Sequence, residues 1–128
     1  MDVAGWFDRY VAAFVALCRG DRDDAEALLE YYSVPLLITG DADSSWFGTA
    51  DEVLAVARGQ MAAMRDAGFD RTEMSGAQAV ALNRTSTWFA ADFVRRRGDD
   101  SEIAAFSAFY LITDLPVGRR ITTLGIRS

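Results

Sequence analysis

One continuous stretch, Thr85–Asp114, has the sequence TSTWFAADFVRRRGDDSEIAAFSAFYLITD. It predicts two strands, Thr85–Arg97 and Glu102–Thr113, joined by the polar turn Gly98–Ser101. Alternation normally gives a strand one core face and one water face, but here both faces are largely apolar. On the second strand, one face carries Phe106, Ala108, Tyr110 and Ile112, and the other carries Ile103, Phe109 and Leu111. Because a sheet that is apolar on both sides needs two covers, we expect the chain's own helices on one side and a partner subunit on the other.

The composition describes one ordinary domain spanning residues 1–128. With 51% hydrophobic and 12% aromatic residues, a chain of 128 residues can bury a real core. No apolar run reaches about 20 residues, so we expect no membrane span, and Met1–Ala4 lacks the basic region of a signal peptide. The single cysteine, Cys18, fits a small core residue in a reducing compartment. We therefore expect a cytoplasmic protein.

The absence of two residue types limits the reactions that the protein could catalyse. The chain has no histidine, and all 13 of its basic residues are arginine. Catalytic histidines, imidazole zinc ligands and the lysine of a phosphate-binding loop are therefore excluded. The net charge of −6 argues against nucleic acid as a partner. We expect no metal and no cofactor, so any acid–base chemistry would rely on Asp, Glu or Tyr.

The remaining patterns predict helices first and strands afterwards. Apolar residues at spacings of three and four predict helices at Val3–Arg19, Arg22–Glu30 and Ala50–Ala67, the last after the capping box Thr49–Glu52. Extended segments are expected at Tyr31–Thr39, Trp46–Gly48, Phe69–Leu82 and Arg120–Arg127. Pro35 lacks a backbone donor, so its strand should be an edge strand or begin after the proline. Helices gathered before an antiparallel sheet indicate an α+β fold.

Several short markers accompany this order of elements. They are Arg9–Ala13 followed by Gly20–Asp23, Gly48–Ala50 at the entry to the long helix, and Tyr31–Leu36 with Gly68–Phe69. With them the chain resembles the nuclear transport factor 2-like (NTF2-like) superfamily, which includes the SnoaL-like polyketide cyclases and the ketosteroid isomerases. The last pair of markers resembles an uncharacterised bacterial subgroup. The resemblance implies a curved sheet wrapped around the long helix, a cone-shaped apolar cavity, and a homodimer formed through the sheet.

The resemblance to ketosteroid isomerase can be compared position by position. That enzyme holds an enolate oxygen with a tyrosine and a protonated aspartic acid, and it moves the proton with a carboxylate. The tyrosine position falls on Tyr10, which matches. The acid position falls on Tyr110, which can still donate a hydrogen bond, whereas the base position falls on Thr39, which cannot serve. The resemblance therefore implies part of an oxyanion site but not steroid isomerisation.

Asp92 interrupts the apolar run Trp88–Val94. A carboxylate in an apolar wall would have a raised pKa, which suits a general acid or base. Its face depends on the register of the hairpin, because a slip of one residue reverses every side chain. A symmetric turn would pair Phe89 with Tyr110 and direct Asp92 away, whereas a three-residue turn would place Asp92 on the Tyr110 face. The alternative role for Asp92 is an ion pair with an arginine at a dimer interface.

These residues define a candidate site for a small apolar ligand. We expect Tyr10 and Tyr110 to orient the ligand, and the apolar walls to come from Phe14, Trp46, Met61, Met64 and Phe106. The three arginines Arg95–Arg97 could bind an anion, and alternation directs Arg96 away from the other two. We expect them instead to be solvated, because strand ends are commonly charged.

Three functions remain open from the sequence. The first is binding of a small apolar molecule between the helices and the sheet. The second is a metal-free isomerase, cyclase or hydratase, which needs Asp92 in the cavity beside Tyr10 or Tyr110. The third is a non-catalytic structural dimer or partner-binding subunit, in which side chains would fill the cavity.

Overall fold

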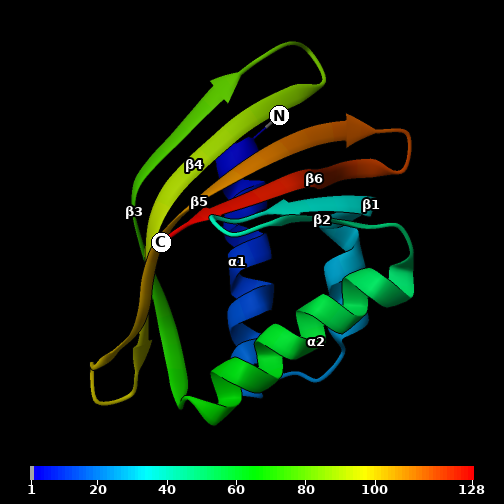
Figure 1. Cartoon of the computed structure of the whole chain (residues 1–128). Helices are drawn as coiled ribbons and strands as arrows, with labels where there is room; N and C mark the ends of the chain where they lie inside the picture. The colour runs from blue at the N-terminus through cyan, green and yellow to red at the C-terminus, as the bar shows by residue number, and fades with distance from the viewer. Residues whose placement is uncertain (1) are drawn as a thin grey trace.

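The computed structural model describes residues 2–128, which form helices packed on one curved sheet (Figure 1). The elements are α1 (Val3–Arg19), the 3₁₀ helix η1 (Ala25–Glu30), β1 (Tyr32–Thr39), β2 (Ser44–Phe47), α2 (Ala50–Asp66), β3 (Phe69–Ala81), β4 (Ser86–Arg97), β5 (Glu102–Leu115) and β6 (Gly118–Arg127). The six strands follow the order β2-β1-β6-β5-β4-β3. β1 and β6 are parallel, and the other neighbours are antiparallel. The predicted α+β fold is confirmed.

Both long helices begin and end at residues that suit helix termini. The Asp2 carboxylate accepts the Gly5 N–H at 3.0 Å and so caps α1. Gly20 ends that helix in the left-handed region, with φ of 85°. Thr49 accepts the Glu52 N–H at 3.2 Å, as the capping box predicts, and α2 begins at the next residue. None of the helices in the described part of the chain is long and apolar enough to cross a membrane.

The second predicted helix is shorter than expected. The sequence predicts a helix at Arg22–Glu30, but only Ala25–Glu30 is helical, and it is a 3₁₀ helix. Asp24 has a non-helical backbone, with ψ of 75°, and its carboxylate binds the Arg22 guanidinium at 2.6 Å. Residues two positions apart do not face each other on a helix, so this ion pair fits the non-helical backbone that precedes Ala25.

The strand that contains Pro35 is not an edge strand, and it does not begin after the proline, since β1 starts at Tyr32. Both predicted alternatives are therefore wrong. β1 lies between β2 and β6. Its pairing with β6 shifts in register between Tyr32 and Leu37, and its pairing with β2 begins only at Leu36. The proline therefore lies where the ladder is already interrupted, and its missing N–H costs no hydrogen bond.

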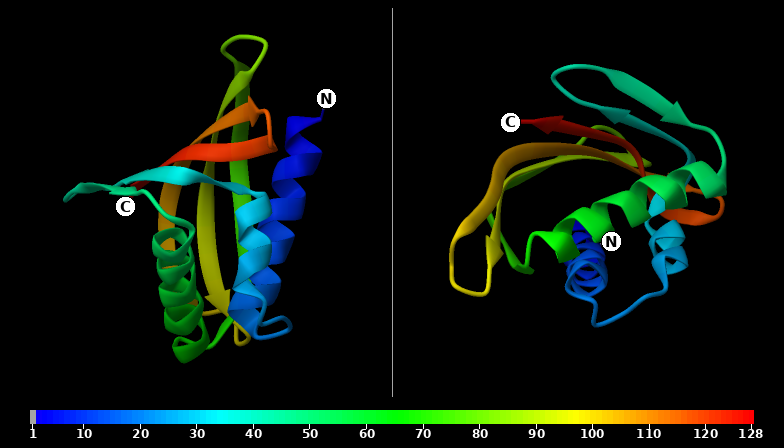
Figure 2. Two further views of the ribbon diagram at one scale, coloured as in Figure 1. Left: turned by 90° about the vertical axis from the view of Figure 1, so that its right-hand side faces the viewer. Right: turned by 60° about the horizontal axis from the view of Figure 1, so that its bottom comes forward.

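The sheet bends because its ladders contain several irregular positions. The register shifts between Ser75 and Gln78 in β3, and also between Arg95 and Arg96 in β4. Gly76, with φ of 62°, supplies a backbone conformation in the first of these shifts that other residues rarely adopt. Such irregularities increase bending and twist. Figure 2 shows the result, in which the sheet arches over α1 and α2 on its concave side.

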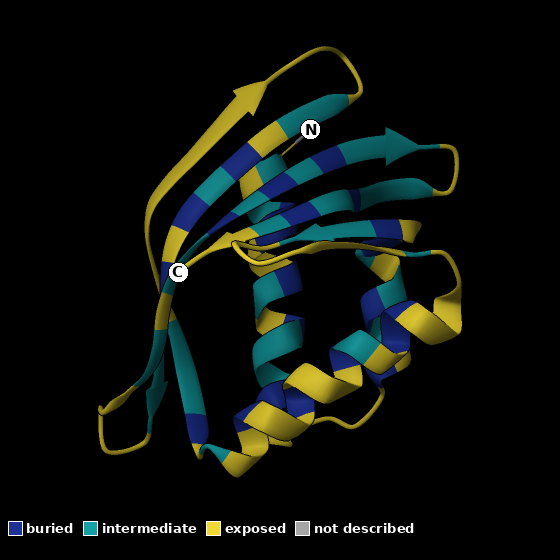
Figure 3. Ribbon diagram, in the orientation of Figure 1, coloured by how far each residue is buried: buried dark blue, intermediate teal, exposed yellow. Residues whose placement is uncertain are grey.

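The core lies between the helices and this concave inner face. Phe7 of α1 is fully buried, and its ring stacks on Phe89 at 4.2 Å between centroids and meets Tyr110 edge-on at 4.8 Å. Phe89 lies opposite Tyr110 in the β4–β5 ladder, which is the register of the symmetric turn. Buried positions alternate along β4 and β5 as the sequence predicts (Figure 3). Two of them, Phe89 and Tyr110, contact Phe7 of α1.

The other face of the sheet has no helix of the described chain over it (Figure 2). Trp88 and Phe109 stack there at 6.0 Å, and Trp88 keeps 38% of its surface exposed. We call this the outer face, and define it by Trp88, Asp92, Ser107, Phe109 and Leu111. A partner subunit over this face stays a prediction.

Candidate functional site

A cavity of about 130 Å³ lies between the two long helices and the inner face of the sheet. Its walls are mostly apolar and include Phe14 from α1, Val53 and Ala57 from α2, and Phe106 and Leu124 from the sheet. This volume is close to the roughly 150 Å³ of an engineered apolar cavity that binds benzene. A ligand of about one ring therefore fits the space.

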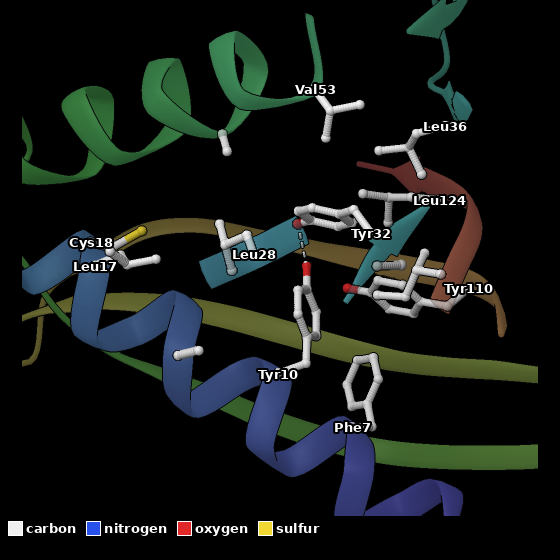
Figure 4. Packing of buried hydrophobic residues seen from close by; sticks show 14 of the residues in the cluster. Phe7, Tyr10, Leu17, Cys18, Leu28, Tyr32, Leu36, Val53, Tyr110 and Leu124 are labelled. Carbon is white, nitrogen blue, oxygen red and sulfur yellow. Dashed lines mark hydrogen bonds between the residues drawn. The ribbon is translucent and has the colours of Figure 1, made fainter. Parts of the chain in front are cut away.

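Three tyrosines line this cavity, and their hydroxyl groups lie near one another (Figure 4). They come from different elements: Tyr10 from α1, Tyr32 from β1 and Tyr110 from β5. The Tyr10 and Tyr32 hydroxyl oxygens are 2.6 Å apart, and either group can donate. Within the described chain the Tyr110 hydroxyl makes no hydrogen bond, so it can donate to a ligand.

Burial keeps these hydroxyls protonated. Loss of hydration raises the pKa of Tyr32 to about 12, although the hydrogen bond with Tyr10 and the charge of Arg95 both lower it. Burial also raises the pKa of Tyr10 and of Tyr110, and each is raised further by the neighbouring tyrosines. At neutral pH all three groups are therefore neutral hydrogen-bonding groups and not bases.

Arg95 brings a positive charge to the same cavity. Its Nη1 donates to the Gln60 side-chain oxygen at 3.2 Å and contacts the Met64 sulfur at 3.7 Å. Its guanidinium carbon lies 4.8 Å from the ring centroid of Phe106 and 5.6 Å from that of Phe14. Arg95 is half-buried and Gln60 is exposed, so the guanidinium lies where the cavity meets solvent.

Some predicted ligand-binding residues line the cavity and others do not. Tyr10, Phe14, Phe106 and Tyr110 all line it. The remaining three lie elsewhere, and they are Trp46, Met61 and Met64.

The reasons differ for these three residues. Met61 and Met64 are buried on the inner side of α2, where they pack in the core next to the cavity. Trp46 is 67% exposed because it lies on β2, the short edge strand, beyond the cover of the helices. None of these three predicted wall residues therefore lines the cavity.

Asp92 lies on the outer face, away from the cavity. The pairing of Phe89 with Tyr110 sets this orientation, because Asp92 is an odd number of residues from Phe89. The carboxylate is exposed, and the Ser107 hydroxyl on the neighbouring strand donates to it at 2.5 Å. The carboxylate that an acid–base mechanism needed beside Tyr10 or Tyr110 is therefore not there.

The sequence reasoning missed Tyr32 and Arg95 as cavity residues. Arg95 could have been found by alternation, since it follows Phe93 by two residues and so shares its face. The next two arginines behave as a charged strand end: Arg96 binds Glu73 at 2.7 Å, and Arg97 donates to the Ala67 carbonyl at 2.7 Å. The prediction that all three arginines are solvated therefore holds for a strand end but not for Arg95, which lines the cavity.

These groups define what the cavity can do chemically. It can enclose an apolar body, donate hydrogen bonds from tyrosine hydroxyls and pair an anion with a guanidinium. Among the described residues that line it there is no carboxylate, histidine or lysine, so the lining offers no ordinary proton acceptor.

Solved structures with the same fold come from several bacteria. An NTF-2-like protein of unknown function from Shewanella oneidensis is 13% identical, with a TM-score of 0.64 over 94% of this chain and 98% of that one. An NTF2-like protein with a cystatin-like fold from Novosphingobium aromaticivorans is 16% identical, with a TM-score of 0.70 over 93% and 77%. A "putative ketosteroid isomerase" from Parabacteroides distasonis is 9% identical, with a TM-score of 0.69 over 98% and 87%.

The sequence itself matches one family model over nearly its whole length. No curated protein matches the chain. The model described as NTF2-like protein (DUF6841) matches residues 1–127. The superfamily resemblance seen in the short markers is thereby confirmed, and the chain belongs to the NTF2-like family DUF6841.

Proposed function

We propose that this protein binds a small, mostly apolar molecule in the cavity between α1, α2 and the inner face of the sheet. The observation that carries the proposal is the cavity itself, with mostly apolar walls and three tyrosines whose hydroxyl groups lie near one another. This combination is typical of small-molecule sites in proteins. Tyr110 and the Tyr10–Tyr32 pair would orient the ligand.

Binding is proposed here in preference to catalysis. The isomerase, cyclase or hydratase mechanism required Asp92 within reach of a tyrosine hydroxyl, and Asp92 lies on the outer face. The buried tyrosines have raised pKa values, so they favour hydrogen bonding over proton removal. A bound ligand would thus be held and oriented without transfer of a proton to a cavity carboxylate.

The proposal is tested by filling the cavity. The probe is para-fluorobenzyl alcohol, a neutral single-ring molecule, and its binding is followed by fluorine NMR. Ala108→Leu adds methyl groups at a fully buried position of β5 that lines the cavity. Ala105→Leu is the matched control, because Ala105 is an exposed residue on the opposite face of the same strand.

We expect the wild type and Ala105→Leu to bind the probe equally and Ala108→Leu to lose binding. Thermal unfolding shows whether Ala108→Leu still folds, since overpacking costs about 1–3 kcal/mol. Val56→Phe, at a half-buried lining position on α2, is a second way to fill the space. If folded cavity-filling variants bind as well as the wild type, or if the wild type binds no single-ring probe, neutral or charged, the proposal is wrong.

A further inference from the structure

The cavity has an unbalanced charge. Arg95 is the one charged residue among the described residues that line it. No carboxylate of the described chain lies within 4.0 Å of its guanidinium nitrogens, although the protein carries a net charge of −6. A charge that is partly removed from water without an opposite charge is unfavourable. A bound anion would supply the missing partner.

Most of the hydrogen-bonding capacity of Arg95 is unused. A guanidinium has five N–H donors in a planar fork. Within the described chain, Nη1 is the one guanidinium nitrogen of Arg95 that makes side-chain hydrogen bonds, to the Gln60 oxygen and the Met64 sulfur. The Nε and Nη2 donors are left without a protein partner, and together they match the two oxygens of a carboxylate.

The guanidinium is also held in place before any ligand arrives. The rings of Phe106 and Phe14 lie 4.8 Å and 5.6 Å from its central carbon, and both rings line the cavity. Such cation–ring contacts fix the position of the charge without neutralising it. The other two arginines of the run are occupied, Arg96 by Glu73 and Arg97 by the Ala67 carbonyl. Arg95 is therefore the arginine of this run that is placed to receive a ligand.

We propose that the ligand is a small aromatic or branched-alkyl carboxylate, whose carboxylate pairs with Arg95 while its apolar body occupies the cavity. This inference rests on the function proposed above and adds the chemical class of the ligand. The apolar part would lie between Val53 and Leu124, with the Tyr110 hydroxyl as an additional donor. The charged end would remain at the side where Arg95 and the exposed Gln60 meet solvent.

The residues that line the cavity limit the charge that a bound ligand can carry. One guanidinium balances a single negative charge, and the rest of the lining is neutral. A phosphate carries more charge and more acceptor oxygens than this site can satisfy. The effect of Arg95 on the cavity supports the assignment, since its charge lowers the pKa of Tyr10, Tyr32 and Tyr110 against the larger effect of burial.

The test compares two probes that share one ring. Para-fluorobenzoate carries the carboxylate, and para-fluorobenzyl alcohol is its neutral counterpart. Both are titrated by fluorine NMR into the wild type, Arg95→Gln and the control Arg96→Gln. In the wild type we expect para-fluorobenzoate to bind at least about tenfold more tightly than the alcohol, because hydrogen bonds between a guanidinium and a carboxylate are roughly twice as strong as those between neutral groups.

Arg95→Gln should remove that preference, so that the two probes bind this variant with affinities within about twofold of each other. Arg96→Gln, which changes the neighbouring arginine on the other side of the strand, should keep the preference. Arg95→Lys keeps the charge but loses the fork, so it should give an intermediate preference and shows whether a folded charge-retaining variant still selects the carboxylate.

Two failures are distinguishable. If both probes bind the wild type equally, or if Arg95→Gln keeps the preference, the carboxylate assignment is wrong while binding of apolar molecules stands. If neither probe binds, the proposed function and this inference fail together.

Discussion

Phe89 and Trp88 are neighbours in β4, yet they belong to two different regions. Phe89 on the inner face is 3% exposed and stacks on Phe7, whereas Trp88 on the outer face is 38% exposed and stacks only on Phe109 within the described chain. Both faces are apolar in sequence, but in the described part of the chain the helices cover the inner face, which lines the cavity. Apolar residues alone therefore do not indicate which face of a sheet carries a binding site. A cavity forms on the face that helices cover.

The largest expected effect comes from truncating the two neighbours. Phe89→Ala should lower the free energy of unfolding by about 3–5 kcal/mol, because it opens a hole under a stacked, buried ring. Trp88→Ala should lower it by less than about 2 kcal/mol, since the ring is partly exposed and loses mainly one stacking contact. Urea denaturation of both variants measures the difference. Equal losses would show that the outer face is as well covered as the inner one.

The second prediction concerns the stability of the protein at alkaline pH. Tyr110→Phe tests whether the inner face shields this tyrosine from water. The pKa of Tyr110 is raised by burial, so the folded protein keeps this proton while the unfolded chain releases it above about pH 10. Stability from this group is therefore complete below pH 10 and falls as pH rises, by up to about 1.4 kcal/mol per pH unit.

Tyr110→Phe should remove that part of the alkaline slope. The measurement is urea denaturation of wild type and variant at pH 8 and at several values above pH 10. Cys18, whose pKa is raised to about 11 by burial, contributes a similar loss to both proteins and cancels in the comparison. Parallel curves for the two proteins above pH 10 would mean that Tyr110 is not shielded from water.

The smallest expected effect is that of Asp92→Asn on the outer face. Its carboxylate is exposed and accepts from Ser107, and the amide oxygen of asparagine can accept the same bond. We expect a change in unfolding free energy within about 0.5 kcal/mol and no change in the affinity for para-fluorobenzyl alcohol. Loss of ligand binding in this variant would place Asp92 functionally on the inner face and contradict the hairpin register.

Local patterns were sufficient for most of the fold. Capping residues and apolar spacing predicted both long helices, since each signal depends on residues within a few positions. The hairpin strands were also predicted, together with the alternation that places Phe106 and Tyr110 on one face. Pro35 shows the limit of such reasoning, because its position inside a sheet depends on where two other strands pair with β1.

The residues of the site were harder to predict from the sequence, because their positions also depend on contacts between distant segments. The face of Asp92 depended on a turn register that the sequence left open. Trp46 was assigned to a wall although its strand ends at the sheet edge. The charge state of the cavity depends on Arg95, whose partners Gln60 and Phe14 come from two helices distant in sequence. Only the three-dimensional arrangement brings these groups together.

The inner face lines the cavity in which we propose that the ligand binds, whereas the outer face has no helix of the described chain over it. The most direct test of this proposal is a crystal structure of the protein with para-fluorobenzoate diffused into the crystal. We expect electron density for the ring between Val53 and Leu124, with the carboxylate of the ligand bound to the Arg95 guanidinium. A cavity closed by Phe14 and Phe106, or a ring bound only against Trp88 and Phe109, would contradict it.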